Sequence, residues 1–289
     1  YTQYIKQKEI DREIQQRLYE NQQREIEKME AFIAQQKQWN RERNIIAAES
    51  RQKAIDRMEK IEKPKDLPGK IKIKFRKSMT SGNDVMFVEN LSKSYPGKTL
   101  FTDINFKIRK KERVFLLGPN GCGKSTLVKI LISKLQADSG VVEFGHKVQI
   151  GYYDQELSDL DESNTILEEL IDSNSDLTLT QIRTLLSSFL FKGEDVLKPI
   201  SALSGGEKSR VALAKLILST SNFLILDEPT NHLDINSREV LEEALANYEG
   251  TILSISHDRY FINKLATRIL ELDNCSLLDI EGNYDFFMD

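Results

Sequence analysis

The strongest chemical signal in the chain is a glycine-rich stretch that fits the phosphate-loop pattern G-x-x-x-x-G-K-[ST]. Its members are Gly118, Pro119, Asn120, Gly121, Cys122, Gly123, Lys124, Ser125 and Thr126. Backbone N–H groups and a helix N-terminus can hold a polyphosphate there, Lys124 can reach its β- and γ-phosphates, and Ser125 can hold a magnesium ion. A chance glycine-rich turn is the alternative. The apolar run 114–117 before the loop predicts a strand and residues 127–132 predict a helix, as the motif requires.

Acidic side chains end a second apolar run. Residues 223–226 lead directly into Asp227 and Glu228. Two carboxylates at the end of a buried strand are costly unless they have a task, so Asp227 is a candidate for supporting magnesium and Glu228 for activating water. Simple ion pairing is the alternative. A third apolar run, 251–255, precedes His257, which would lie either at the ligand-binding edge of an open α/β sheet or in an exposed loop.

Two further places suit a nucleotide. Ser204, Gly205 and Gly206 precede a predicted helix, 211–217, which gives a second helix start with exposed backbone N–H groups and a serine donor. Tyr95 lies just before a predicted turn, upstream of the phosphate loop. Its ring can stack on an adenine, and a surface tyrosine in a hairpin is an equally good interpretation.

The chain has 289 residues, 39% of them apolar, which is enough for one large domain or two smaller ones. No apolar run approaches the roughly 18 residues of a membrane span, and the first residues lack a signal peptide's apolar core, so we predict a cytoplasmic protein. The two cysteines, Cys122 and Cys275, indicate neither a disulfide framework nor a metal cluster. Cys122 is interpreted as a small loop residue, with redox sensing as the alternative.

The first 63 residues contain no glycine or proline and favour helix throughout. Apolar residues recur mostly three or four apart in one narrow stripe: Ile5, Ile10, Ile14, Leu18, Ile26, Met29, Phe32 and Ile33. A second stripe can face the first if the chain reverses near Asn40 and Asn44. Its members are Ala47, Ala48, Ile55, Met58 and Ile61. The pattern predicts an α-helical antiparallel coiled-coil hairpin.

The predicted hairpin has a basic tip. Residues 1–80 carry 20 Lys+Arg against 13 Asp+Glu, whereas residues 81–289 carry 21 against 32. The residues Lys37, Trp39, Arg41 and Arg43 gather at the reversal. Phosphates can take these charges and a base can stack on the indole, so RNA is one expected partner. A solvated spacer with Trp39 packed on the turn explains the same residues equally well.

Several shorter patterns organise the remainder. Prolines and a glycine within 64–69 end the helical stretch, and the alternating basic residues 70–76 predict a charged edge strand. Residues 86–106 predict a strand hairpin, and residues 141–152 predict a second hairpin that turns at a glycine and a histidine. Residues 158–200 predict a helical insert.

With these residues in place, residues 85–289 resemble an ATP-binding cassette (ABC) ATPase domain. The motifs that carry the resemblance stand in the family's order: the phosphate loop 118–126, Gln155, the signature Leu203-Ser204-Gly205-Gly206-Glu207, the strand 223–228, the loop Asn231-His232-Leu233-Asp234 and His257. The resemblance implies an α/β fold with a parallel-sheet core, an antiparallel β subdomain and a helical subdomain at 158–200. It also implies ATP and Mg²⁺ as cofactors.

The resemblance assigns roles to the residues of the nucleotide site. It implies that Tyr95 stacks on adenine and that the loop 118–126, through Lys124, binds the phosphates. The residues implied to handle magnesium and its waters are Ser125, Gln155 and Asp227.

The resemblance also implies an ATPase whose catalytic residues are Glu228, His257 and Gln155. Glu228 resembles the general base and His257 the sensor of the γ-phosphate. Family members pair head-to-tail, so the signature would cap the ATP of a second ABC domain rather than its own. The capping residues would be Ser204, Gly205, Gly206 and Glu207.

The helical hairpin narrows the resemblance. Only 85 positions separate Gly118 from Leu203, which leaves no room for the inserted coiled coil of DNA-repair members. A charged hairpin followed by an ABC domain resembles the ABC-F subfamily, in which such a linker joins two ABC domains. That resemblance implies action on ribosomes and translation, with the linker tip near tRNA, and in some members protection of the ribosome from antibiotics. The alternatives are the ATP-binding subunit of an ABC transporter and a scaffold that ATP binding locks.

The expected organisation is a helical hairpin linker arm at 1–66, a crossover with the basic edge strand at 67–84, and the ABC ATPase domain at 85–289. The last residues, 282–289, resemble the first, with Tyr284 aligned on Tyr1. We therefore expect the chain to be the linker and second ABC domain of a longer protein. Its expected partners are an N-terminal ABC domain, or a second copy of this chain paired head-to-tail, and a ribosome with its rRNA and tRNA.

Overall fold

The computed structural model describes residues 2–38, 42–58, 75, 79–154, 157, 159–174, 177–231 and 233–288, with only the backbone at 2–13, 36–38, 42–48 and 288. The chain forms two compact units, Tyr1–Lys70 and Ile71–Asp289.

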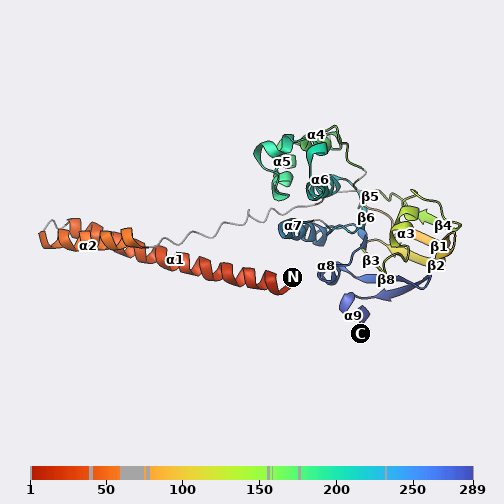
Figure 1. The fold of residues 1–289 in the computed structure, drawn as a ribbon, viewed down its shortest axis with the longest axis horizontal. Helices are drawn as coiled ribbons and strands as arrows, with labels where there is room; N and C mark the ends of the chain where they lie inside the picture. Colours follow the sequence, from red (N-terminus) through yellow and green to blue (C-terminus); the bar gives the residue numbers. More distant parts are fainter. Residues whose placement is uncertain are drawn as a thin grey trace. The chain divides into compact units, whose positions relative to one another are not determined.

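The first unit is a two-helix hairpin of unequal arms. Its helices are α1 (Thr2–Gln38) and α2 (Glu42–Arg57). At 1.5 Å per residue they are about 55 Å and 24 Å long, and α2 lies along the part of α1 that precedes the reversal (Figure 1). Ile33 and Ile55 are buried between them, whereas Ile14 and Leu18 are 53% and 51% exposed. The hairpin is as predicted, but Asn44 is not a turn residue because it lies inside α2.

The second unit contains two sheets, a three-stranded antiparallel sheet of order β2-β1-β4 and a six-stranded sheet of order β5-β6-β7-β3-β8-β9. In the larger sheet, the neighbouring strands β5, β6, β7, β3 and β8 are parallel to one another. The edge strand β9 is antiparallel to β8. The strands of the smaller sheet are β1 (Asp84–Tyr95), β2 (Lys98–Arg109) and β4 (Ser139–Phe144). Those of the larger sheet are β3 (Arg113–Leu117), β5 (Ile150–Tyr153), β6 (Phe223–Asp227), β7 (Thr251–Ile255), β8 (Arg268–Asp273) and β9 (Ser276–Glu281).

The hairpin predicted for 141–152 is wrong, because β4 and β5 belong to different sheets. After β4 the chain stays against β1, since the Gly145 N–H donates to Val85 O at 2.9 Å and a Cβ on Gly145 would lie 1.8 Å from Asp84 O. The chain then joins β6, where the Phe223 N–H donates to Gln149 O at 3.1 Å. The hairpin predicted within 86–106 is confirmed by the pairing of β1 with β2.

Helices cover both faces of the larger sheet. They are α3 (Lys124–Leu131), α4 (Ile166–Asp172), α5 (Leu179–Ser188), α6 (Gly205–Leu218), α7 (Ile235–Ala246), α8 (Arg259–Leu265) and α9 (Tyr284–Met288). Short 3₁₀ turns lie at Gly193–Leu197 and Ile200–Ala202. In Figure 1, α4 and α5 gather beside α6, whereas α3 lies beside β1 and β4. This is the predicted α/β fold: a mainly parallel core, an antiparallel sheet and a helical part.

Two hydrophobic cores follow from the alternation of side chains along the strands. On β3, Leu116 packs with the smaller sheet and α3, while Phe115 packs with α6 to α8. On β6, Ile225 and Leu224 divide in the same way. Side chains of successive strand residues point to opposite faces, so strands buried on both faces read as the unbroken apolar runs seen in the sequence.

The parallel arrangement brings the candidate residues to one edge. Strands β6, β7 and β3 are neighbours, and their carboxyl ends lead into Glu228, His257 and the loop at Gly118. Of the predicted basic strand 70–76, only Phe75 lies in the described part. Its ring packs on Tyr248 with centroids 4.5 Å apart.

Candidate functional site

The phosphate-loop residues form a turn that demands glycine. Gly118, Gly121 and Gly123 have φ values of +145°, +76° and +113°. A Cβ on Gly118 would lie 2.2 Å from Leu272 O, so β8 approaches the loop too closely for any side chain. Gly123 precedes α3 and leaves its first N–H groups without a side-chain cap. A helix start of this kind suits an anion.

Two lysines hold the carbonyl groups of this loop. Lys124 donates from Nζ to Gly118 O at 2.8 Å and to Pro119 O at 2.9 Å. Lys98, the first residue of β2, donates to Gly121 O at 2.7 Å. An ammonium group binds a charged phosphate oxygen more strongly than a neutral carbonyl, so both cations can exchange these bonds for a polyphosphate.

Asp227 is the last residue of β6 and Glu228 follows it; both carboxylates are buried, 3% and 8% exposed. Among the described residues, Asp227 Oδ1 and Glu228 Oε1 have no hydrogen-bond partner. Burial raises the pKa of both carboxyls, against an opposing hydrogen bond from Ser125 to Asp227 and the opposing charge of His257 beside Glu228. A buried oxygen without a donor is costly, so these atoms fit a site that a cation or a water completes.

The backbone of Glu228 is strained. Its φ is +50°, in the left-handed region that only glycine and asparagine visit readily. The strain is held by hydrogen bonds on both sides, from the Glu228 N–H to Ile255 O at 3.0 Å and from the Asn231 N–H to Glu228 O at 3.1 Å. The Glu228 carboxylate lies beside His257, whose Nε2 is 3.5 Å from Glu228 Oε1.

A cavity of about 560 Å³ joins these groups. The predicted residues that line it are Tyr95, Asn120, Gly121, Gly123, Lys124, Ser125, Thr126, Asp227, Glu228 and His257. The volume lies within the roughly 300–1,000 Å³ of small-molecule sites. Unpartnered carboxylate oxygens opposite two ammonium groups fit a nucleoside triphosphate with a divalent cation, with the aromatic ring of Tyr95 in the same wall.

The cavity also includes Asn231, from the loop motif that carries the resemblance, and three residues that sequence reasoning did not single out: Lys98, Leu100 and Ile255. Lys98 and Leu100 are two apart on β2 and share one face, a signal that strand alternation does contain. What the sequence lacked was the pairing that carries β2 to the phosphate loop. Gln155 and His232 lie outside the described residues.

The signature residues form a separate structure at the start of α6. Ser204 caps the helix: its Oγ accepts from the Glu207 N–H at 3.4 Å, and the Glu207 carboxylate accepts from the Ser204 N–H at 2.9 Å and from Oγ at 2.7 Å. The Ser204 donors hold the pKa of Glu207 below its ordinary value. None of the described residues in 203–207 lines the cavity over the phosphate loop.

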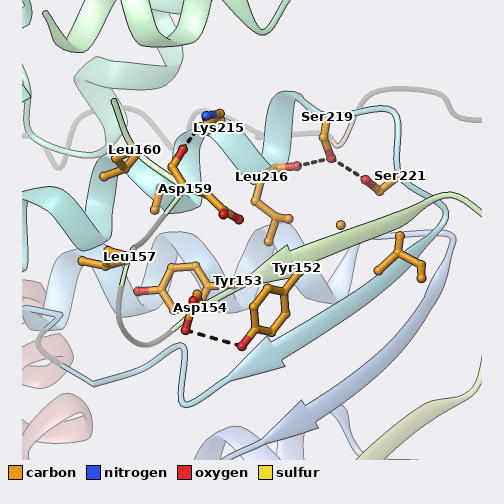
Figure 2. Close-up of a pocket in the computed structure, with 13 residues that line it drawn as sticks. Tyr152, Tyr153, Asp154, Leu157, Asp159, Leu160, Lys215, Leu216, Ser219 and Ser221 are labelled. Atoms are coloured by element: carbon orange, nitrogen blue, oxygen red, sulfur yellow. Dashed lines mark hydrogen bonds between the residues drawn. The ribbon is translucent and has the colours of Figure 1, made fainter. Parts of the chain in front are cut away.

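A second, smaller cavity of about 190 Å³ lies between β5 and α6 (Figure 2). Its lining combines the leucines Leu157, Leu160 and Leu216 with the charged residues Asp154, Asp159 and Lys215. Asp154 accepts a hydrogen bond from the Tyr152 hydroxyl at 3.4 Å (Figure 2). This cavity contains none of the residues predicted to bind nucleotide.

Comparison with known proteins agrees with the site. Residues 101–231 match a family model described as ABC transporter, and residues 1–75 match an extension model with the same description. The chain contains an ABC ATPase domain. Two solved structures share the fold of this ABC domain. An ATP-binding subunit of an ABC transporter has a TM-score of 0.59 at 24% identity, over 70% of this chain and 91% of that one.

The second solved structure is a dimeric ATP-binding cassette in a post-hydrolysis state, bound to ADP and Pi. It has a TM-score of 0.58 at 20% identity, over 68% of this chain and 98% of that one. At such low sequence identities, the two structures support the ABC fold only.

Closer relatives align along the hairpin and the ABC domain together. YdiF of Bacillus subtilis is 46% identical over 288 residues, covering 99% of this chain and 44% of YdiF. ABC transporter F family member 2 of Arabidopsis thaliana is 38% identical over 293 residues, covering 100% of this chain and 43% of that protein. The chain thus spans less than half the length of these curated relatives. In the described part of the chain, no helix combines the length and apolarity needed to cross a bilayer.

Proposed function

We propose that the ABC domain binds and hydrolyses ATP. The observation that carries the proposal is the pair of buried, incompletely bonded carboxylates of Asp227 and Glu228, which end a strand beside the phosphate loop. Lys124 and the loop N–H groups would bind the phosphates, and Tyr95 would stack on the base. Glu228 would accept a proton from the attacking water, and His257 would contact the γ-phosphate.

A magnesium ion fits this arrangement. Ser125 and Asp227 already lie within hydrogen-bonding distance of each other, and one Asp227 oxygen has no partner in the described residues. These two residues, with Gln155, would hold the ion and its waters. When bound, Mg²⁺ neutralises phosphate charge; the chain's own residues position the water and take its proton.

We further propose that a second ABC domain completes the site. The signature residues Ser204 to Glu207 do not line the cavity over the phosphate loop of their own chain, so they are available to cap another domain's nucleotide. Isolated chains would then pair head-to-tail, and hydrolysis per molecule would rise steeply with concentration. Phosphate release measured over a hundredfold dilution series checks this. A rate per molecule that is fast and independent of dilution would contradict it.

The larger role that we propose is that of an ABC-F protein, acting on ribosomes in the cytoplasm. Two observations support it. The helical hairpin of α1 and α2 precedes the ABC domain, and a relative named as an F family member aligns over both parts. Because the chain covers only 43–44% of its relatives, we propose that it is the linker and second ABC domain of a longer protein. A gene without a second phosphate loop upstream of Tyr1 would refute that proposal.

Ribosome binding is tested with the longer protein carrying Glu228→Gln, which should trap the ATP-bound, paired state. We expect this variant to co-sediment with ribosomes in ATP. Reversing the tip charges at Lys37, Arg41 and Arg43 should abolish co-sedimentation. A matched reversal on the exposed shaft, at Arg17, Arg24 and Lys28, is the control that should not. Equal sedimentation of the trapped protein and its tip variant would exclude the tip as the contact.

The ATP-binding subunit of a transporter is the second candidate. The observation that favours it is the cavity between β5 and α6 (Figure 2), which lies beside the start of the helical insert, the part of the domain that would contact a membrane protein in a transporter. Leu160→Asp would place a charge in that cavity. Flotation with membranes that Leu160→Asp abolishes would favour the transporter role, and ribosome sedimentation unaffected by the same substitution would favour the ABC-F role.

A further inference from the structure

Two aspartates cap consecutive helices in the same way. Asp234 is the N-cap of α7, and its Oδ1 accepts from the Asn236 and Ser237 N–H groups at 3.0 and 3.1 Å. Its Oδ2 binds Nη1 of Arg210, from α6, at 3.1 Å. The carboxylate thus fixes the start of one helix and ties it to the helix that begins at the signature.

The second cap repeats the arrangement one helix further on. Asp258 is the N-cap of α8, and its Oδ1 accepts from the Tyr260 and Phe261 N–H groups at 3.0 and 3.2 Å. Its Oδ2 faces Nη1 of Arg238 at 3.3 Å. Arg238 lies four residues after Asp234 on α7, so the two arginine–aspartate pairs follow each other along one helix.

Asp258 is also the residue that immediately follows His257. Its N–H donates to Ser256 Oγ at 3.1 Å, so a hydrogen bond joins the two residues that flank the histidine. The His257 side chain is 57% exposed, and its Nε2 lies 3.5 Å from Glu228 Oε1. A half-exposed imidazole is placed mainly by the backbone that carries it, which makes the anchoring of Asp258 decisive for that distance.

We propose that Arg238 is a positioning residue, which holds Asp258 and thereby fixes His257 opposite Glu228. Arg238 does not line the cavity over the phosphate loop, so it acts through the histidine and not on the ligand. Through Asp234 and Arg210, the same contacts reach α6 and the signature. The expectation that moving His257 alters ATP hydrolysis rests on the function proposed above. The proposal that Arg238 places His257 does not depend on that function.

The placement is tested without nucleotide by NMR of the histidine side chains. The chain has only three histidines, and the resonance missing from His257→Gln assigns the signal of interest. Arg238→Gln should shift or broaden the His257 signal and leave His146 unchanged. Asp258→Asn should do the same, because asparagine still caps α8 but no longer offers a charged oxygen to the guanidinium. Arg238→Lys should restore the signal in part.

The matched control is Arg268→Gln, which removes another arginine from its carboxylates, Glu112 and Asp279. Arg268 begins β8 and therefore lies at the opposite edge of the parallel sheet from His257. We expect it to lower the melting temperature without moving the His257 signal. A His257 signal unchanged in both Arg238→Gln and Asp258→Asn would overturn the proposal, as would an equal change in Arg268→Gln.

Hydrolysis supplies the second readout. We expect Arg238→Gln to lower kcat about threefold to thirtyfold, with the ATP dissociation constant unchanged, and the Arg238→Gln/Asp258→Asn double variant to be no slower than either single variant. Additive losses would show that the two residues act separately and would contradict the pairing. If the wild type hydrolyses no ATP while Arg238→Gln still displaces the His257 signal, the proposed function fails and the positioning role stands.

Discussion

The two glycine-bearing helix starts of the ABC domain are built in opposite ways. At α3, Gly123 has a φ of +113° and provides no side-chain cap, so the first N–H groups remain available to a ligand. At α6, Ser204 and Glu207 bond each other, and a carboxylate lies at the helix start. The first end is left open, as an anion-binding helix start requires. The second is complete within the chain, which suits a surface that meets a ligand held by another molecule.

The side chains around the two helix starts differ in the same way: in the described part of the chain, polar groups lack partners near α3 and are paired near α6. Around α3 lie the Asp227 and Glu228 oxygens that lack a partner among the described residues, together with the imidazole of His257; these are the groups proposed above to act in hydrolysis. Around α6 the charges are already paired, as Lys208 is with Glu162 at 2.6 Å and Arg210 with Asp234. Chemistry is therefore expected at the first end only, with the second acting across an interface.

The largest expected effect comes from inactivating the helix start at α3 in one chain and the helix start at α6 in another. Lys124→Ala should remove phosphate binding, and Ser204→Arg should block the signature surface, so each variant alone should hydrolyse no ATP. Mixed in equal amounts, half of the head-to-tail pairs would contain one intact site, which restores about a quarter of the wild-type rate. Phosphate release from the mixture measures this. A mixture as inactive as its parts would break the comparison, because each chain would then need both of its own ends.

The next effect concerns the carboxylates. Glu228→Gln should lower the hydrolysis rate about 10²- to 10⁴-fold while ATP still binds, because the amide cannot accept the proton of the attacking water. Glu242→Gln is the matched control, since Glu242 is also a buried carboxylate, 2% exposed, and is paired with Lys264 at 2.8 Å. Single-turnover phosphate release compares them. Equal losses in both variants would indicate a general effect of altering buried carboxylates.

The glycines allow a third comparison. Gly118→Ala places a Cβ 2.2 Å from Leu272 O at a φ of +145°. We therefore expect the free energy of unfolding to fall by at least about 2 kcal/mol, and ATP binding to be lost as well. Gly205→Ala meets nothing within 4 Å and should stabilise α6 by about 0.5–1 kcal/mol. Urea unfolding measures both. A tolerated Gly118→Ala would show that β8 can move away from the loop.

Local patterns explain how much of this could be predicted. The phosphate loop, the signature and the buried strands are each defined by residues within a few positions of one another, and the structure contains them at the expected places. Lys98 escaped prediction because its contact with Gly121 depends on how β2 packs against the loop. The hairpin at 141–152 was wrong because two short strands in succession do not reveal that they enter different sheets.

The strain at Glu228 could not be predicted for a related reason. Glutamate has no preference for a φ of +50°, so the conformation is imposed by hydrogen bonds to Ile255 and Asn231, which are distant or loop residues. The pair of Arg238 and Asp258 likewise joins two helices whose contact exists only in the folded domain. Sequence identifies the groups that do chemistry, whereas the groups that hold them in place depend on tertiary packing.

The smallest expected effect tests whether the first end is destabilised in preparation for its ligand. Burial raises the pKa of Asp227 above its ordinary 3.8, so the charged carboxylate is less favourable in the nucleotide-free fold than in the unfolded chain. Asp227→Asn should therefore raise the melting temperature without nucleotide by about 2–4 °C, corresponding to roughly 1 kcal/mol.

The sign of the pH dependence follows from the raised pKa. The folded state binds the proton more tightly than the unfolded state, so the cost of the charge is present at pH values above the raised pKa and disappears as the pH falls toward 3.8. The advantage of Asp227→Asn should accordingly shrink on acidification. Thr178→Asn, which keeps a helix cap at α5 whose partner Gln181 does not titrate, should show no such trend. Thermal unfolding between neutral and mildly acidic pH measures the difference, and a constant advantage for Asp227→Asn would mean that its charge is not what destabilises the nucleotide end.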